Sequence, residues 1–197
     1  MHILLTGANG FIGSALGRAL RARGHKVSGF DFEHFLGCLD SGKGQAVQEK
    51  VLHEALGNNP VDAVFHLAAR YELQQGDFSL RRFNVAAPLT LFDYLEDREM
   101  CRVFFNVGTA LPPETGQYAA TKHSFVDALR ERALNGLGLG VVNLALVQTY
   151  GPGGSSRRFE QWLMRRLREP STTIQLTTGV QKRDFIFVED AVHAMRL

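Results

Sequence analysis

Short apolar runs alternate with amphipathic stretches along the whole chain. We expect strands at the apolar runs His2–Thr6, His25–Asp31, Asp62–Leu67, Arg102–Val107 and Leu139–Val147, with weaker candidates at Thr173–Leu176 and Phe185–Val188. We expect helices that begin near Phe11, Ala46, Phe78, Tyr118 and Ser155. This alternation is typical of a parallel sheet whose strands are joined by crossover helices. The pattern predicts an α/β fold, a doubly wound parallel sheet of the Rossmann type.

Two glycine-containing stretches interrupt the pattern. Residues Phe32–Gln45 hold three glycines without a clean period, which predicts a loop. Gly151-Pro152-Gly153-Gly154 would break the preceding strand before a new helix. We therefore expect an NAD(P)-binding Rossmann domain over residues 1–150 and a small, apparently incomplete substrate-binding lobe over residues 151–197.

The first predicted strand leads into a helix through a glycine-rich turn, Gly7-Ala8-Asn9-Gly10-Phe11-Ile12-Gly13. We expect Gly7 to allow the tight turn, Gly10 to let the backbone approach a pyrophosphate, and Gly13 to let helix and strand pack closely. The N-terminus of the helix would stabilise the phosphate charge. The turn predicts a dinucleotide site, to which Asn9, Phe11 and Ile12 are also assigned.

Asp31 stands at the end of the next predicted strand, about 20 residues after the turn. A carboxylate there can accept hydrogen bonds from the adenosine ribose hydroxyls and would repel a 2′-phosphate. This favours NAD as the cofactor, with NADP as the other possibility. The competing interpretation is a glycine-rich turn with a solvated aspartate at a strand end.

Tyr118 and Lys122 are four residues apart on a predicted helix, so both side chains can serve one site. A nearby ammonium would favour the tyrosine phenolate and lower the pKa of the phenol. Thr109, just after a predicted strand, could donate a hydrogen bond to the reacting oxygen. The competing interpretation is an exposed helix pair without catalytic meaning, because this spacing is common by chance.

Six ordered motifs are similar to those of the extended short-chain dehydrogenase/reductases, the NAD-dependent epimerase/dehydratase family. They are Thr6–Gly13, Phe65–Ala69, Phe83–Val85, Tyr118–Lys122, Tyr150–Gly153 and Arg183–Asp190. The resemblance implies that Leu67, Ala68 and Ala69 lie beside the cofactor, which Tyr118 and Lys122 also bind. It assigns Thr109, Tyr118 and Lys122 to catalysis, and Asn84 and Arg183 to the substrate, a nucleotide-linked sugar. Without the resemblance, Asn84 would be a helix residue with an ordinary hydrogen bond, and His66 a packed strand residue.

Within the family, Phe104–Thr109 and Gln181–Phe185 most resemble nucleotide-sugar reductases of the CDP-abequose synthase type. Dehydration is disfavoured, because Thr109 is followed by Ala110 and Leu111 rather than by an acidic pair. The resemblance also implies a longer chain. Because the sequence stops at Leu197, inside the helix expected to begin at Glu189, we expect a fragment or a shortened member.

Charge and cysteine content exclude several other classes. The 22 basic and 20 acidic residues give a net charge of +2, which provides no broad field for nucleic acid or for a membrane surface. Two isolated cysteines predict neither a disulfide framework nor a metal site. No apolar run approaches the roughly 18 residues that span a bilayer, so we expect a cytoplasmic protein.

Positive charge gathers late in the chain, at Arg157, Arg158, Arg165, Arg166, Arg168 and Arg183. Phe159, Trp162 and Leu163 form an apolar stripe at helical spacing, so most of these arginines should be a solvated helix face. Only Arg183 is assigned to the substrate. The resemblance implies a homodimer built from two helices.

Two functions remain open at this stage. One is an NAD(P)-dependent oxidoreductase or epimerase that transfers hydride to or from a nucleotide-linked sugar. The other is a shortened, non-catalytic module that binds a dinucleotide as a sensor or scaffold.

Overall fold

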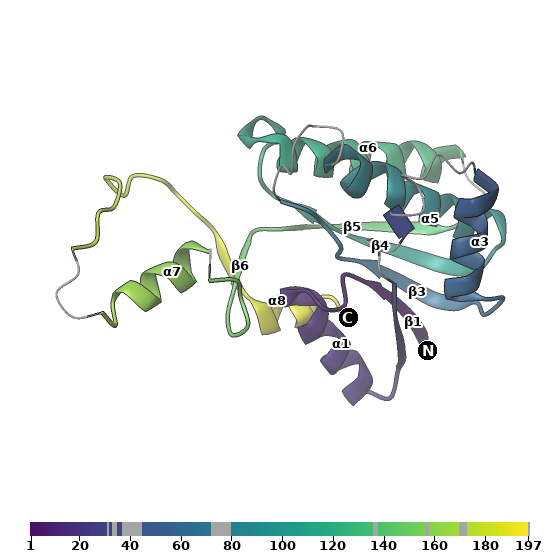
Figure 1. Cartoon of the computed structure of the whole chain (residues 1–197), viewed down its shortest axis with the longest axis horizontal. Coiled ribbons are helices and arrows are strands. Elements are labelled where there is room, and N and C mark those ends of the chain that lie inside the picture. The colour runs from purple at the N-terminus through teal and green to yellow at the C-terminus, as the bar shows by residue number, and fades with distance from the viewer. Residues whose placement is uncertain are drawn as a thin grey trace.

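The computed structural model describes residues 1–30, 32, 35–36, 45–71, 80–135, 138–156, 158–169 and 173–196. Its central sheet has five parallel strands in the order β2-β1-β3-β4-β5 (Figure 1). They are β1 (His2–Thr6), β2 (Lys26–Phe30), β3 (Val61–His66), β4 (Cys101–Thr109) and β5 (Gly140–Leu146). The strand order reverses between β1 and β3, and in doubly wound sheets ligands bind beyond the carboxyl ends of the strands at such a point. The predicted fold class is confirmed.

Helices cover both faces of the sheet (Figure 1). One face carries α1 (Phe11–Ala22) and α8 (Val188–Ala194). The other carries α3 (Gln45–Leu56), α5 (Ala87–Asp97) and α6 (Gln117–Asn135). A π-helical turn, η1 (Arg82–Ala86), leads directly into α5, and a short 3-10 turn, η2 (Pro113–Thr115), precedes α6.

The two faces follow from the alternation of side chains along each strand. In β1, Leu5 packs in a cluster with Leu16 and Leu20 of α1, whereas Leu4 belongs to a second cluster that includes Leu91 of α5 and Phe104 of β4. All of these side chains are at most 4% exposed. Strands buried on both faces are typical of parallel sheets, and this explains the nearly continuous apolar runs in the sequence.

A second, two-stranded parallel sheet pairs β6 (Gln148–Tyr150) with β7 (Phe185–Phe187). The helix α7 (Phe159–Arg166) lies between these strands in the sequence and projects away from the central sheet (Figure 1). The expected domain boundary after residue 150 stays a prediction, since β6 precedes it and pairs with a strand beyond it. Among the described residues, no helix is both long and apolar enough to span a membrane.

Several expected elements differ from the structure. The strand expected to run through Val147 ends at Leu146, and β6 follows as a separate strand. The strand predicted at Thr173–Leu176 is wrong, because the segment forms no regular element and pairs with no strand. The helix expected near Ser155 begins at Phe159, and α8 ends at Ala194, before the last described residue.

The loop predicted for Phe32–Gln45 is wrong in part. Phe32, Phe35 and Leu36 are helical and buried, and the two phenylalanine rings pack against Phe30 at the end of β2. Burial of these rings outweighs the irregular local glycine pattern. The start expected near Phe78 lies outside the described residues, and the chain is already helical at Leu80.

Candidate active site at the carboxyl edge of the sheet

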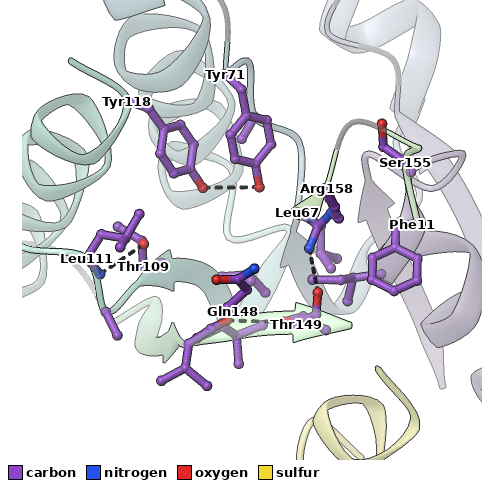
Figure 2. Close-up of a pocket in the computed structure, with 18 of the residues that line it drawn as sticks. Phe11, Leu67, Tyr71, Thr109, Leu111, Tyr118, Gln148, Thr149, Ser155 and Arg158 are labelled. Atoms are coloured by element: carbon purple, nitrogen blue, oxygen red, sulfur yellow. Dashed lines mark hydrogen bonds between the residues drawn. The ribbon is translucent and has the colours of Figure 1, made fainter. Parts of the chain in front are cut away.

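A cavity of about 1280 Å³ opens at the carboxyl ends of the central strands (Figure 2). It brings together most of the predicted site residues, and those that line it are Gly7, Gly10, Phe11, Ile12, Gly13, Leu67, Ala69, Thr109, Tyr118 and Arg183. The other assigned residues do not line it: Asn9 is exposed, Ala68, Asn84 and Lys122 are buried, and Asp31 lies outside the described residues.

The glycine turn has the shape that a dinucleotide requires. Gly7 has φ +67°, and a Cβ atom there would lie 2.7 Å from the Ala68 backbone nitrogen. A Cβ atom on Gly13 would lie 2.1 Å from the Gly7 carbonyl oxygen. Gly10 precedes α1 and provides no side-chain cap. The first N–H groups of the helix can therefore bind phosphate oxygens, so the turn fits a dinucleotide pyrophosphate.

Thr6 fixes the strand end beside this turn, a role that the sequence pattern did not predict. Its oxygen accepts from the backbone N–H groups of Leu67 and Ala68, both at 3.2 Å, and its hydroxyl shares a hydrogen bond with Nδ1 of His66 at 2.8 Å. These bonds hold residues 67–69 at the cavity wall. A threonine in an apolar strand, one residue before the glycine turn, was the only available signal.

His66 is structural, as the interpretation without the family suggested. It is fully buried, and burial first, then the charge of Lys122, holds its pKa well below the usual range. Because the Thr6 oxygen already accepts from two backbone N–H groups, we assign its proton to the bond with Nδ1 and the ring proton to Nε2. That atom has no hydrogen-bond partner among the described residues, and the ring packs against Phe125 at 5.3 Å.

Asn84 connects two walls of the site. Its Oδ1 accepts from the backbone N–H of Arg70 at 2.9 Å, and its Nδ2 donates to the Arg70 carbonyl and to the Thr121 hydroxyl at 3.0 and 3.1 Å. The Thr121 hydroxyl in turn donates to the Tyr118 carbonyl at 2.9 Å. Asn84 is 1% exposed, and both ends of its amide have protein partners. Its assigned contact with a substrate stays a prediction.

Thr109 and Tyr118 present hydroxyls to the same cavity (Figure 2). Thr109 ends β4, and its Oγ1 accepts from the Leu111 backbone N–H at 3.2 Å, which orients the oxygen while its O–H can still donate. Tyr118 lies in the first turn of α6 and stacks on Tyr71, with ring centroids 4.2 Å apart. Its hydroxyl donates to that of Tyr71 at 3.4 Å.

The electrostatics of the pair differ from expectation. Burial, and then the neighbouring Tyr71, raise the pKa of Tyr118 well above its usual range, and Arg158 opposes this rise. Lys122 is 2% exposed, and burial lowers its pKa to about 8. Lys122 is not among the groups that shift the pKa of Tyr118 here, so its expected effect on the phenol beside a bound cofactor stays a prediction. The cation that acts in that direction is Arg158.

The C-terminal segment supplies a cationic wall. Arg158, Lys182 and Arg183 line the cavity together with Asp184. The guanidinium of Arg158 lies 5.0 Å from the centroid of the Phe11 ring and donates to the Thr149 carbonyl. The prediction that Arg158 lies on a solvated helix face is wrong. Arg158 precedes α7, and its side chain points toward Phe11, at the end of the glycine-rich turn. Arg157 lies outside the described residues.

Arg165 and Arg168 are exposed, and Arg166 forms an ion pair with Glu169 at 2.8 Å. These three arginines make the solvated face that was expected. Across the described part of the chain, no group of three His, Cys, Asp or Glu side chains could hold a metal ion.

Comparison with known proteins agrees with this geometry. A family model described as the NAD dependent epimerase/dehydratase family matches residues 3–197. CDP-abequose synthase of Salmonella typhimurium is 27% identical over 205 residues, covering 98% of this chain and 68% of that protein. UDP-glucose 4-epimerase of Corynebacterium glutamicum is 25% identical over 220 residues, covering 96% of this chain and 63% of the relative.

Solved structures show the same fold. UDP-glucose 4-epimerase of Thermotoga maritima superposes with a TM-score of 0.77 at 22% identity, covering 98% of this chain and 72% of that one. The Thermus thermophilus UDP-glucose 4-epimerase complex with NAD has a TM-score of 0.72 at 23% identity, covering 100% and 73%. The expected resemblance and the expected cofactor class are confirmed. With its family model matched over residues 3–197, this chain belongs to the NAD-dependent epimerase/dehydratase family.

Proposed function

We propose that this chain transfers hydride between NAD(H) and a carbon of a nucleotide-linked sugar, and that it acts as a keto-sugar reductase. One observation carries the proposal: Thr109 and Tyr118 line the same cavity as the glycine turn. A dinucleotide bound at the glycine turn and a substrate bound at the two hydroxyls would therefore share one cavity.

Different groups of the chain would bind different parts of the cofactor. The N–H groups at the start of α1 would bind the pyrophosphate, and Leu67 and Ala69 form the adjoining wall. Asp31 is assigned to the adenosine ribose, and Lys122 to the nicotinamide ribose. NADH held by these residues would supply the hydride that reduces the carbonyl carbon of the sugar.

Thr109 and Tyr118 act on the carbonyl oxygen. The Thr109 hydroxyl donates a hydrogen bond that polarises the carbonyl, and Tyr118 gives its proton to the oxygen as the oxygen gains the C=O electron pair. A tyrosine whose pKa is raised keeps its proton near neutral pH, which suits a general acid. An epimerase that first oxidises its substrate would use the same tyrosine as a base, so the choice of reduction rests on the similarity to CDP-abequose synthase.

The cationic wall fits the diphosphate of a nucleotide sugar. Guanidinium groups bind phosphate oxygens through paired hydrogen bonds, and Arg158 and Arg183 both line the cavity beside Lys182. Two similar proteins, CDP-abequose synthase and UDP-glucose 4-epimerase, carry nucleotide-sugar names, which agrees with this ligand class. By the same resemblance we infer a homodimer in the cytoplasm.

The test is NADH oxidation with a panel of 4-keto nucleotide sugars, followed at the reduced-nicotinamide absorbance band. We expect the parent protein to oxidise NADH and Tyr118→Phe to lose about 100- to 10,000-fold of the rate while still binding NADH. NADH binding without oxidation by the parent would support the binding module. Equal rates for parent and Tyr118→Phe would remove the tyrosine from the mechanism.

A further inference from the structure

Two tyrosines from distant parts of the chain meet at the reacting end of the cavity. Tyr71 follows β3 and Tyr118 begins α6, and their rings are nearly parallel, with an interplanar angle of 22°. Figure 2 shows the rings side by side, with the two hydroxyls at the same edge and joined by the 3.4 Å hydrogen bond. Tyr71 therefore touches the atom that gives up a proton in the proposed reaction.

A network of hydrogen bonds holds the bases of both side chains. Asn84 binds both backbone polar groups of Arg70, the residue before Tyr71. Asn84 also donates to Thr121, whose hydroxyl donates to the Tyr118 carbonyl. Hydrogen bonds therefore connect the two backbone segments that carry Tyr71 and Tyr118, and this connection keeps the two phenol rings in contact.

The proposed reduction needs a proton in every cycle. Tyr118 loses its proton to the substrate and must regain one before the next turnover. Lys122 is 2% exposed, and His66 is fully buried with a lowered pKa. His123 directs Nε2 at the Leu111 carbonyl. Tyr71 is 62% exposed and already contacts the Tyr118 hydroxyl, so it joins the reacting centre to solvent.

We propose that Tyr71 relays protons between solvent and Tyr118, an inference that rests on the proposed reductase function. After Tyr118 has lost its proton, the Tyr71 O–H bond breaks and a new Tyr118 O–H bond forms. The electron pair left on the Tyr71 oxygen then takes a proton from water or from a buffer acid. A hydroxyl can both donate and accept, so the same contact serves before and after the transfer.

The test compares Tyr71→Phe with the parent protein. This variant keeps the stacked ring and removes only the hydroxyl. We expect the first turnover to keep the parent rate and later turnovers to slow by about 10- to 100-fold, at or below the range for positioned proton transfer. A small acid such as imidazolium should restore the rate. Tyr150→Phe is the matched control, since Tyr150 is 40% exposed and packs against Phe185 and Phe187 instead.

A second readout needs no turnover. With ¹³C-labelled tyrosine in the NAD-bound protein, the Tyr118 signal is assigned by its loss in Tyr118→Phe, and its chemical shift at neutral pH is then compared between the parent and the variants. Tyr71 raises the pKa of Tyr118, whereas Arg158 lowers it. Tyr71→Phe removes the hydroxyl that contacts the Tyr118 oxygen and should therefore move the Tyr118 signal, whereas Tyr150→Phe should leave it in place.

The outcomes separate the relay from the proposed function. An active parent whose Tyr71→Phe variant turns over equally fast in every buffer would overturn the relay. Loss of rate in Tyr71→Leu but not in Tyr71→Phe would also overturn it, because stacking alone would then matter. A Tyr118 signal that stays in place in Tyr71→Phe would show that the hydroxyl contact is absent and would overturn the relay. A Tyr118 signal that moves in Tyr71→Phe, together with a parent that never oxidises NADH, would instead overturn the reductase function.

Discussion

Replacing Thr6 with valine removes one buried hydroxyl while nearly keeping the shape of the side chain. Thr6 is 0% exposed, and the change takes away the donor to His66 Nδ1 and the acceptor for the N–H of Ala68. The N–H of Leu67 keeps the Thr6 carbonyl as a partner at 3.3 Å. Two buried polar groups are left unsatisfied, each costing about 1–3 kcal/mol, so we expect a loss of about 2–6 kcal/mol.

The assay is urea unfolding followed by circular dichroism, with Thr6→Ser as the control. Serine keeps the hydroxyl and loses one methyl group, worth about 0.8 kcal/mol of burial. Thr6→Val should also weaken NADH binding, because residues 67–69 would no longer be fixed beside the glycine turn. If Thr6→Val is as stable as Thr6→Ser, the hydroxyl does not hold this strand end and the reasoning fails.

Three further changes test other parts of the site. Gly10→Val should weaken NADH binding, measured by calorimetry, and leave the fold largely intact. Gly7→Ala should instead lower the thermal melting temperature, because its Cβ atom would lie 2.7 Å from a backbone atom. Asp31→Ala, a change predicted from the sequence alone, should narrow the preference for NADH over NADPH, and a parent that binds NADPH as tightly would contradict the assignment. Burial lowers the pKa of Lys122 from 10.5 to about 8, so between these values the unfolded chain binds more protons than the folded chain, and stability should rise with pH across this interval. A tenfold difference in the acid dissociation constant between the folded and unfolded chain corresponds to about 1.4 kcal/mol of stability. In urea unfolding, Lys122→Met should flatten this rise of stability with pH. A parent protein whose stability does not change between pH 8 and 10.5 would contradict the burial of Lys122.

The strands, most helix starts and the glycine turn could be predicted because each has a local signal. The apolar runs of β1, β3 and β4 reflect burial within the sheet, and α1 begins at Phe11, directly after the glycines. The irregular segment around Phe32 and Phe35 misled the prediction, because its helical turns are stabilised by aromatic contacts with the rest of the core rather than by their own periodicity.

The chemistry of the site was only partly predictable. Thr109 and Tyr118 were placed correctly in one cavity, because the ends of parallel strands meet at one edge of the sheet. Tyr71 and Arg158 were missed as site residues, since their roles depend on contacts with residues 47 and 147 positions away. The spacing of Tyr118 and Lys122 predicted that the two side chains lie close together. It could not predict how deeply each side chain is buried, and burial shifts the pKa of both.

The hydrogen bonds of Asn84 connect the segment after β3 to the start of α6, so we expect the two segments to move together. A displacement of Arg70 is transmitted through the amide to Thr121 and on to the backbone of Tyr118. Across the cavity, Arg158 contacts the glycine-turn side only through the Phe11 ring, and its hydrogen bond to the Thr149 carbonyl stays within the segment that follows β5. Entry and exit of ligands should therefore deform the arginine side of the cavity, while the tyrosine side keeps its shape.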